Sequence, residues 1–140
     1  MAETISDQFK EAVERYQAGE EVTALIPVFQ EVCDRSPKSS AAWTCLAWLY
    51  LLNDSANAAY KAAQKAVKLN PQDAQARINL ALAMLDSGQS GVRQHIEQAM
   101  QLIMIDSEVR DEINKSIEDG FKRKPEWKSL QRVKNWLFES

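Results

Sequence analysis

Residues 37–71 read PKSSAAWTCLAWLYLLNDSANAAYKAAQKAVKLNP, and this stretch decides the fold. A proline stands at each end, and Pro37 and Pro71 are 34 positions apart (71 − 37 = 34). In the first half, large apolar residues recur at i, i+3, i+4 and i+7, which is the spacing of one helix face. In the second half, small alanines lie on one side, where they would let two helix backbones approach closely. The stretch therefore predicts a tight pair of helices joined by a turn.

This helix pair resembles the tetratricopeptide repeat (TPR), a family with the same period and a similar order of residues. One position departs from the family pattern, because Ala63 stands where the second helix usually carries a large aromatic residue. We expect Tyr60 to fill that space. The resemblance implies a solenoid in which such pairs stack on one another. The matching residues are Trp43, Leu46, Ala47, Tyr50, Ala59, Ala66, Leu69, Asn70 and Pro71.

Weaker copies of the pattern occupy the flanking sequence. Before the central pair, Phe9 replaces the Trp and Tyr16 is in place, whereas Pro27 falls inside the second helix, which should begin later or bend there. After it, Arg77 stands in the position of the Trp, and no proline closes the repeat. The expected repeat-like units are residues 6–37, 38–71, 72–104 and 105–140, in a single domain over 1–140.

The last unit keeps little of the signature but still predicts two helices. One should end near Gly120, and the other should begin after Pro125 with an apolar stripe that includes Trp127. Stacked repeats need a terminal unit with a polar outer face that caps the stack, and we expect this helix pair to be that cap. The expected fold is an all-α, TPR-like, right-handed helical-repeat solenoid of about three repeats plus a degenerate C-terminal helix pair acting as a cap.

Composition narrows the class of protein. The net charge of −3 over 140 residues argues against wholesale binding of nucleic acid. The longest apolar run, residues 41–52, is too short to span a membrane. The first residues lack the pattern of a secretory signal, so we expect a cytoplasmic protein. Cys33 and Cys45 are then expected to be reduced, packed thiols rather than a disulfide or metal ligands.

The sequence offers no convincing catalytic group. Its one histidine, His95, lies among Arg93, Gln94 and Glu97 on a predicted helix, where it has no partner of the kind that a general base needs. Phosphate-binding loops, nucleophile elbows and metal-ligand spacings are also missing from the sequence. We therefore expect a protein that is not an enzyme and that binds no cofactor and no metal.

The TPR resemblance implies a concave groove lined by the first helix of each pair. The groove would be apolar in the middle and polar at its flanks, with Trp48 as its anchor. The predicted partner-binding residues are Lys10, Glu14, Thr44, Trp48, Leu51, Ile78, Asn79, Leu82 and Leu85. Two interpretations stay open, since this strip could be exposed to a partner or buried by neighbouring helices or a second copy in a homodimer.

The predicted function is a non-catalytic protein–protein interaction module: an adaptor, assembly factor or chaperone. Some TPR proteins clamp the carboxylate at the end of a partner chain with Lys, Asn and Arg side chains. Only Lys10 matches such a clamp, and Glu14 would repel a carboxylate. We therefore expect no carboxylate clamp, and the expected partner is an apolar or amphipathic protein segment.

Two alternatives accompany this prediction. The size and apolar groove are similar to those of the small TPR secretion chaperones that shield apolar client segments. Separately, a basic C-terminal segment with interleaved tryptophans could bind an anionic surface or RNA, although a solvated helix face would read the same way. The basic residues are Lys122, Arg123, Lys124, Lys128, Arg132 and Lys134.

Overall fold

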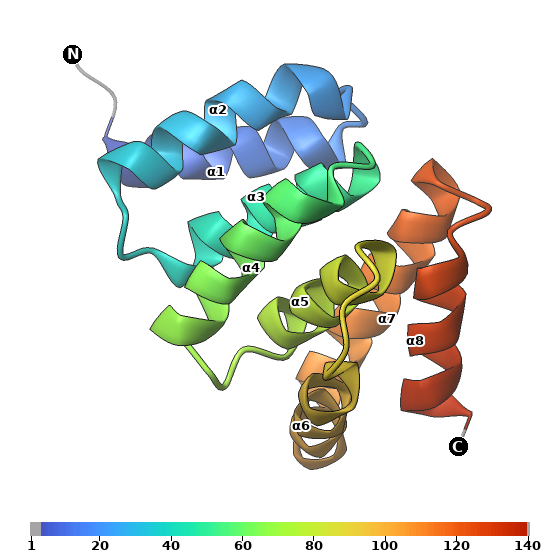
Figure 1. The fold of residues 1–140 in the computed structure, drawn as a ribbon. Coiled ribbons are helices and arrows are strands. Elements are labelled where there is room, and N and C mark those ends of the chain that lie inside the picture. The colour runs from blue at the N-terminus through green and yellow to red at the C-terminus, as the bar shows by residue number, and fades with distance from the viewer. Residues whose placement is uncertain (1–3, 140) are drawn as a thin grey trace.

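The computed structural model describes residues 4–139, and within that range the chain is all helix, with no strand. Successive helices wind around a common curve, which confirms the predicted all-α, TPR-like solenoid (Figure 1). None of the helices in the described range is long and apolar enough to span a membrane. The helices are α1 (Ile5–Gln17), α2 (Val22–Arg35), α3 (Ser40–Leu52), α4 (Ala56–Leu69), α5 (Ala74–Asp86), α6 (Val92–Ile105), α7 (Ser107–Arg123) and α8 (Lys128–Phe138).

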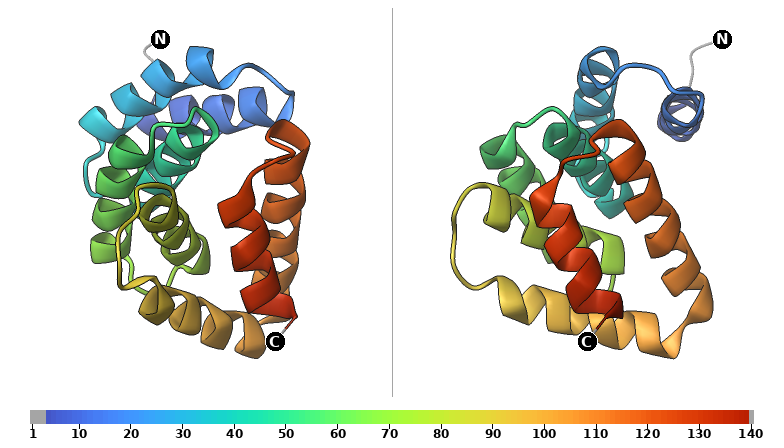
Figure 2. Two further views of the ribbon diagram at one scale, coloured as in Figure 1. Left: turned by 45° about the vertical axis from the view of Figure 1, so that its right-hand side comes forward. Right: turned by 90° about the vertical axis from the view of Figure 1, so that its right-hand side faces the viewer.

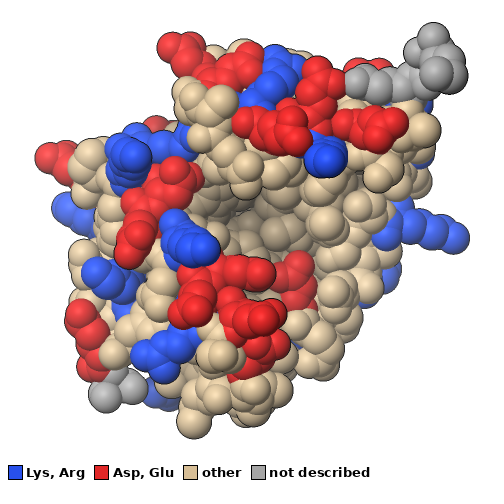
Figure 3. Space-filling view, turned by 180° about the vertical axis from the view of Figure 1, so that it is seen from behind, with Lys and Arg blue, Asp and Glu red and all other residues tan. Residues whose placement is uncertain are grey.

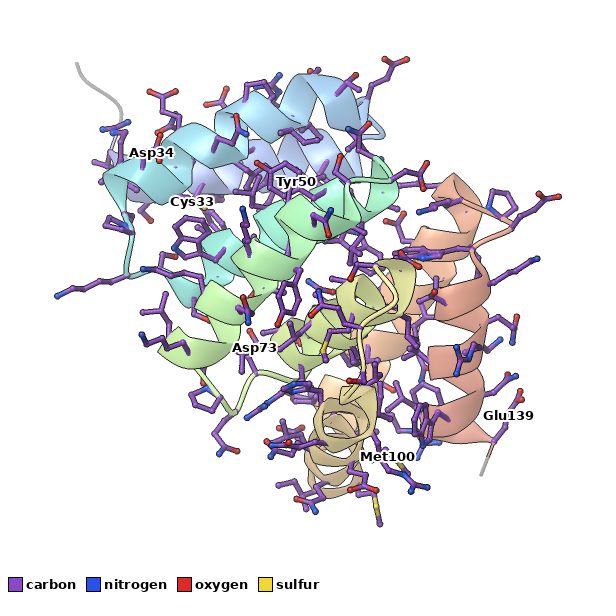
Figure 4. The ribbon with its side chains drawn as sticks, viewed as in Figure 1. Cys33, Asp34, Tyr50, Asp73, Met100 and Glu139 are labelled. Carbon is purple, nitrogen blue, oxygen red and sulfur yellow. The ribbon has the colours of Figure 1, made fainter. Side chains whose placement is uncertain are left out.

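Side-chain caps set where the first helix of each pair begins. Asp73 lies in the turn between α4 and α5, where its carboxylate accepts hydrogen bonds from the backbone N–H groups of Gln75 (2.9 Å) and Ala76 (3.3 Å) (Figure 4). These are donors that have no partner inside the helix. The same role is played by Thr4 for α1, Ser39 for α3 and Asp106 for α7.

One contact repeats with the period of the sequence. The indole Nε1 of Trp43 donates to the carbonyl of Pro37 at 2.9 Å, and the guanidinium Nε of Arg77 donates to the carbonyl of Pro71 at 3.1 Å. Each bond reaches back six residues, and the two donors are 34 positions apart (77 − 43 = 34). Arg77 therefore takes the structural role of the missing Trp, because its hydrogen bond holds the preceding turn against the helix.

Pro27 does not delay the start of α2, which was one of the two outcomes expected for an interior proline. The helix begins at Val22 and continues through the proline to Arg35, with Leu25 and Phe29 fully buried on its inner face. Burial of these two side chains offsets the cost of the backbone hydrogen bond that proline cannot donate. The part of the prediction that placed the start of the helix later is therefore wrong.

The C-terminal pair closes the array and also turns back across its concave side. α8 packs against α5 and α6, and α7 contacts both α5 and α6. Two turned views show the chain curving from α1 round to α8, so that the far end of α7 comes next to the α1–α2 turn (Figure 2). The last unit therefore meets the first one, which a straight stack of repeats would keep apart.

Candidate functional site

Most of the predicted groove residues are buried inside the chain. Trp48 is 8% exposed and Leu51 and Leu82 are fully buried, while Leu85 is half-buried. Thr44, Ile78 and Asn79 are buried too, and only Lys10 and Glu14 are exposed. The apolar strip is thus covered by neighbouring helices, which is the second of the two interpretations that the sequence left open.

The chain's own C-terminal pair covers the strip. The ring centroids of Trp48 and Trp127 are 5.5 Å apart, with their planes tilted by 48°. Gly120 lets Trp48 and Leu130 lie close to the backbone of α7, because a Cβ at that position would lie 3.1 Å from the Trp48 ring and 2.7 Å from the Leu130 side chain. The sequence predicted that a helix ends near Gly120. The helix does end near this position, three residues later at Arg123, and the glycine itself serves close packing inside the helix.

A polar cluster joins the two ends of the curve, and we call Tyr16, Asp119 and Arg123 the α1–α7 latch. The Tyr16 hydroxyl donates to the Asp119 carboxylate and accepts from the Trp48 indole at 2.8 Å. The Arg123 guanidinium donates to the Tyr16 carbonyl at 2.6 Å and lies 4.0 Å from the centroid of its ring. Burial, followed by the hydrogen bond to Asp119, raises the pKa of the Tyr16 phenol. The phenol therefore keeps its proton well above neutral pH, so it can donate to Asp119.

Lys124 makes a second set of internal contacts beside the latch. Its ammonium donates to the carbonyl of Leu51 at 2.8 Å, pairs with Asp54 at 2.7 Å and lies 4.4 Å from the centroid of the Trp127 ring. The Leu51 carbonyl belongs to the last turn of α3, where a cation is favourable. Lys124 thus fastens the start of the α7–α8 turn to the end of α3.

These contacts divide the predicted basic patch. Arg123 and Lys124 are engaged inside the chain, and the Lys134 ammonium lies 5.9 Å from the centroid of the Phe121 ring. Lys122, Lys128 and Arg132 are exposed. A continuous surface of six cations is therefore not what the fold presents.

A pocket of about 420 Å³ persists on the concave side, beside the filled strip. The face seen from behind is hollowed near its centre (Figure 3). Five helices contribute to the walls of the pocket. Its floor is apolar, and polar groups surround the floor. The lining residues are Val13, Tyr16, Gln17, Phe29, Thr44, Cys45, Trp48, Leu49, Gln75, Asn79, Lys115, Ser116 and Asp119.

The pocket contains only part of the predicted site. Thr44, Trp48 and Asn79 line it, whereas Leu51, Ile78, Leu82 and Leu85 do not. The pocket residues on α7 were not predicted, because the sequence pattern indicates a helix there but not which other helices it packs against. Tyr16 was identified only as a repeat residue, and nothing local to it indicates a partner 103 positions away.

Neutral hydrogen-bonding groups hold one wall of the pocket in place. The Asn79 side chain is fully buried, donates to the carbonyl of Thr44 at 3.0 Å and accepts from the Gln75 amide at 2.8 Å. Asn79 thereby ties α5 to α3 at the pocket floor. Burial raises the pKa of the Cys45 thiol to about 12, so at neutral pH this pocket residue is a thiol and not a nucleophilic thiolate.

His95 belongs to the repeat scaffold, away from the pocket. Its Nδ1 lies 3.0 Å from the Arg77 guanidinium, and burial together with the positive charge of Arg77 lowers the pKa of the imidazole. Within residues 4–139, no three or more His, Cys, Asp or Glu side chains gather as a metal site would require. Burial also raises the pKa of the Cys33 thiol on α2 to about 12.

No protein-family model matches the sequence, and no curated protein matches it. Solved structures do resemble the fold. The type III secretion translocator chaperone SycD of Yersinia enterocolitica is 18% identical with a TM-score of 0.61, over 98% of this chain and 91% of that one. MamA (MSR-1 C2) is 16% identical with a TM-score of 0.63, over 95% of this chain and 78% of that one.

A third similar structure is the first TPR of Spaghetti (RPAP3) bound to the HSP90 peptide SRMEEVD. It is 15% identical, with a TM-score of 0.57, and the match covers 94% of this chain and 89% of that one. Identities this low establish a shared fold and leave the function of each protein separate. The helix pairs, the 34-residue contact that Trp43 and Arg77 repeat, and these likenesses together show that the chain has a TPR-like helical-repeat fold.

Proposed function

We propose that the protein is a non-catalytic interaction module that holds a short segment of a partner protein in the concave pocket. The observation that carries the proposal is the pocket itself, about 420 Å³ of space on the face where a TPR-like array is concave. Phe29, Trp48 and Leu49 give it apolar surface, and Gln17 and Gln75 give it amides beside that surface. Such a mixture suits an apolar side chain and the backbone that bears it.

Structures with the same fold support a peptide as the ligand. SycD has been solved in complex with a peptide of the translocator YopD, and that structure is 17% identical to this chain with a TM-score of 0.59. The first TPR of Spaghetti is bound to an HSP90 peptide. An adaptor, an assembly factor and a chaperone for apolar client segments would all use such a pocket, and the similarity to SycD favours the chaperone.

The proposed site is shorter than the groove that the sequence predicts. α7 and α8 occupy the apolar strip around Leu51 and Leu82, which leaves room for a partner only between α1, α2, α3, α5 and α7. The pocket also has no set of cations that could clamp a carboxylate, because Lys115 is its only basic lining residue and Asp119 lies close to it in the sequence. The ligand is therefore a short apolar anchor and not an acidic chain end.

A pair of matched variants tests the proposal. A displayed library of random peptides of about 12 residues is selected on the protein, and the Kd of each selected peptide is then measured by calorimetry. Ser116→Phe places a ring in the pocket wall, and Ser90→Phe makes the same change on the exposed loop before α6. We expect Ser116→Phe to weaken binding by about tenfold or more, and Ser90→Phe to leave it unchanged.

Circular dichroism on both variants controls for loss of the fold. The proposal fails if selected peptides bind Ser116→Phe as tightly as the parent protein while that variant is fully folded. It also fails if the selection on the parent yields no peptide that binds in solution.

A further inference from the structure

The pocket is closed along its length, which limits how a ligand can enter. In an open array, a segment can run along the groove from the first repeat to the last. Here the α1–α7 latch joins the two ends of the curve, with Arg123 donating to the Tyr16 carbonyl at 2.6 Å. α8 in turn packs against α5 and α6. The pocket is therefore a pit that opens on one face, and a ligand enters it by inserting a side chain.

Among the five helices that line the pit, α1 and α7 each carry more exposed carboxylates than exposed cations. On α1, the Arg15 guanidinium is paired with Glu20 at 2.6 Å, which leaves one lysine against three acidic residues. On α7, Asp119 is paired with Arg123 at 3.3 Å, and three basic residues remain against four acidic ones. The exposed carboxylates are Asp7, Glu11 and Glu14 on α1 and Glu108, Asp111, Glu112 and Glu118 on α7.

The charge surplus lies on both sides of the hollow. In the view from behind, red Asp and Glu side chains gather above and below the hollow, with fewer blue Lys and Arg side chains among them (Figure 3). The cations on α7 other than Arg123 are Arg110, whose guanidinium lies 5.5 Å from the centroid of the Phe138 ring, Lys115 and Lys122. At physiological salt a surface charge acts over about 8 Å, so those carboxylates that lie beside the hollow would be felt by residues next to an inserted anchor.

We infer that the segment held by this pocket is cationic: a bulky apolar side chain flanked by Lys or Arg, inserted from the open face. The inference rests on the proposed function and adds the chemical class of the partner. The apolar floor would take the anchor, because buried aromatic surface is where interface energy concentrates. The carboxylates on α1 and α7 would pair with the flanking cations, which raises the association rate and excludes acidic segments.

Three synthetic peptides with the same anchor test the inference. Acetyl-KKLFLKK-amide, acetyl-QQLFLQQ-amide and acetyl-EELFLEE-amide differ only in flanking charge, and acetyl-KKGGGKK-amide has the charge without the anchor. Amide shifts of Thr44, Cys45 and Ser116 in NMR titrations locate binding in the pocket and give the Kd. We expect the lysine peptide to bind about tenfold tighter than the glutamine peptide at about 50 mM salt, and this ratio to shrink at about 500 mM.

Charge reversal on the protein supplies the matched control. Glu14→Lys with Glu112→Lys should invert the order of the lysine and glutamate peptides. Glu21→Lys with Glu31→Lys makes the same charge change around α2 and should leave the order unchanged. Equal binding of all three anchored peptides in the pocket overturns the charge inference and leaves the proposed function standing. No shift at the pocket amides with any peptide overturns both, and binding of acetyl-KKGGGKK-amide as tight as that of the lysine peptide shows that no anchor is used.

Discussion

At the scale of single residues, Arg77 shows how a repeat tolerates loss of its signature. Trp and Arg have little in common as side chains, yet both are long and carry an N–H donor that reaches the carbonyl six residues earlier. The sequence placed Arg77 in the Trp position but could not show that its charge would be buried at 8% exposure. His95 completes the environment, because its neutral ring accepts from the guanidinium.

The contact between Arg77 and His95 leads us to expect that the stability of the fold depends on pH. Burial and Arg77 lower the pKa of His95 below its ordinary value of 6.5, so the unfolded chain binds a proton more readily than the folded one. The contribution of neutral His95 to folding stability is complete above pH 6.5. It is lost as the pH falls through 6.5 toward the lower pKa of the folded state. The free energy of unfolding in urea should therefore be smaller at about pH 5.5 than at about pH 7.5.

His95→Gln serves as the control, since glutamine can accept from Arg77 without titrating. Its free energy of unfolding should change less over the same pH interval than that of the parent protein. An identical pH dependence in the two proteins would assign the effect to carboxylates elsewhere.

At the scale of helices, the pattern predicted where elements lie better than it predicted how they meet. Caps and apolar spacing are local, so the helix pair in residues 37–71 could be identified from neighbouring residues alone. The helices run through Pro27 and Gly120 because tertiary packing overrides local preference at both positions. A glycine inside a helix normally costs stability relative to alanine, and only its surroundings reveal when the opposite holds.

Gly120 therefore offers a test by the sign of its effect. In a helix with free space, Gly→Ala stabilises by up to about 1 kcal/mol. At Gly120 the added methyl would meet Trp48 and Leu130, at 3.1 and 2.7 Å. We expect Gly120→Ala to lower the free energy of unfolding by about 1–3 kcal/mol instead. Ser116→Ala, one turn earlier in α7, should change it far less, and a stabilised Gly120→Ala protein would contradict the packing of α7 on α3.

At the scale of the whole molecule, closure of the curve decides the shape of the candidate site. The sequence predicted the concave face and three residues of the pocket, Thr44, Trp48 and Asn79. It could not predict that α7 returns to α1, since Asp119 and Arg123 meet Tyr16 across more than a hundred positions. Hydrophobic spacing reports which face of a helix is buried but not which distant helix covers it.

Tyr16→Phe tests whether the latch holds the ends together. The change removes the hydroxyl that links Asp119 and Trp48 but keeps the ring beneath Arg123. Loss of the hydroxyl leaves Asp119 and Trp48 without their hydrogen-bond partner. This should lower the free energy of unfolding by about 1–3 kcal/mol and speed amide hydrogen exchange in α7. Tyr60→Phe, which removes an exposed hydroxyl that accepts only from Gln64, is the matched control. Unchanged exchange in α7 of the Tyr16→Phe protein would show that apolar packing alone closes the curve.

The span of the latch also sets an order of events during synthesis. Helix pairs are built from near neighbours in sequence and can form as soon as they leave the ribosome, whereas contacts between distant positions wait for the later partner. Tyr16 and Asp119 are 103 positions apart, so the latch cannot form until most of the chain has emerged. Until then Trp48 and Leu82 lack the C-terminal helices that cover them. The nascent protein thus passes through a stage at which its inner surface is exposed.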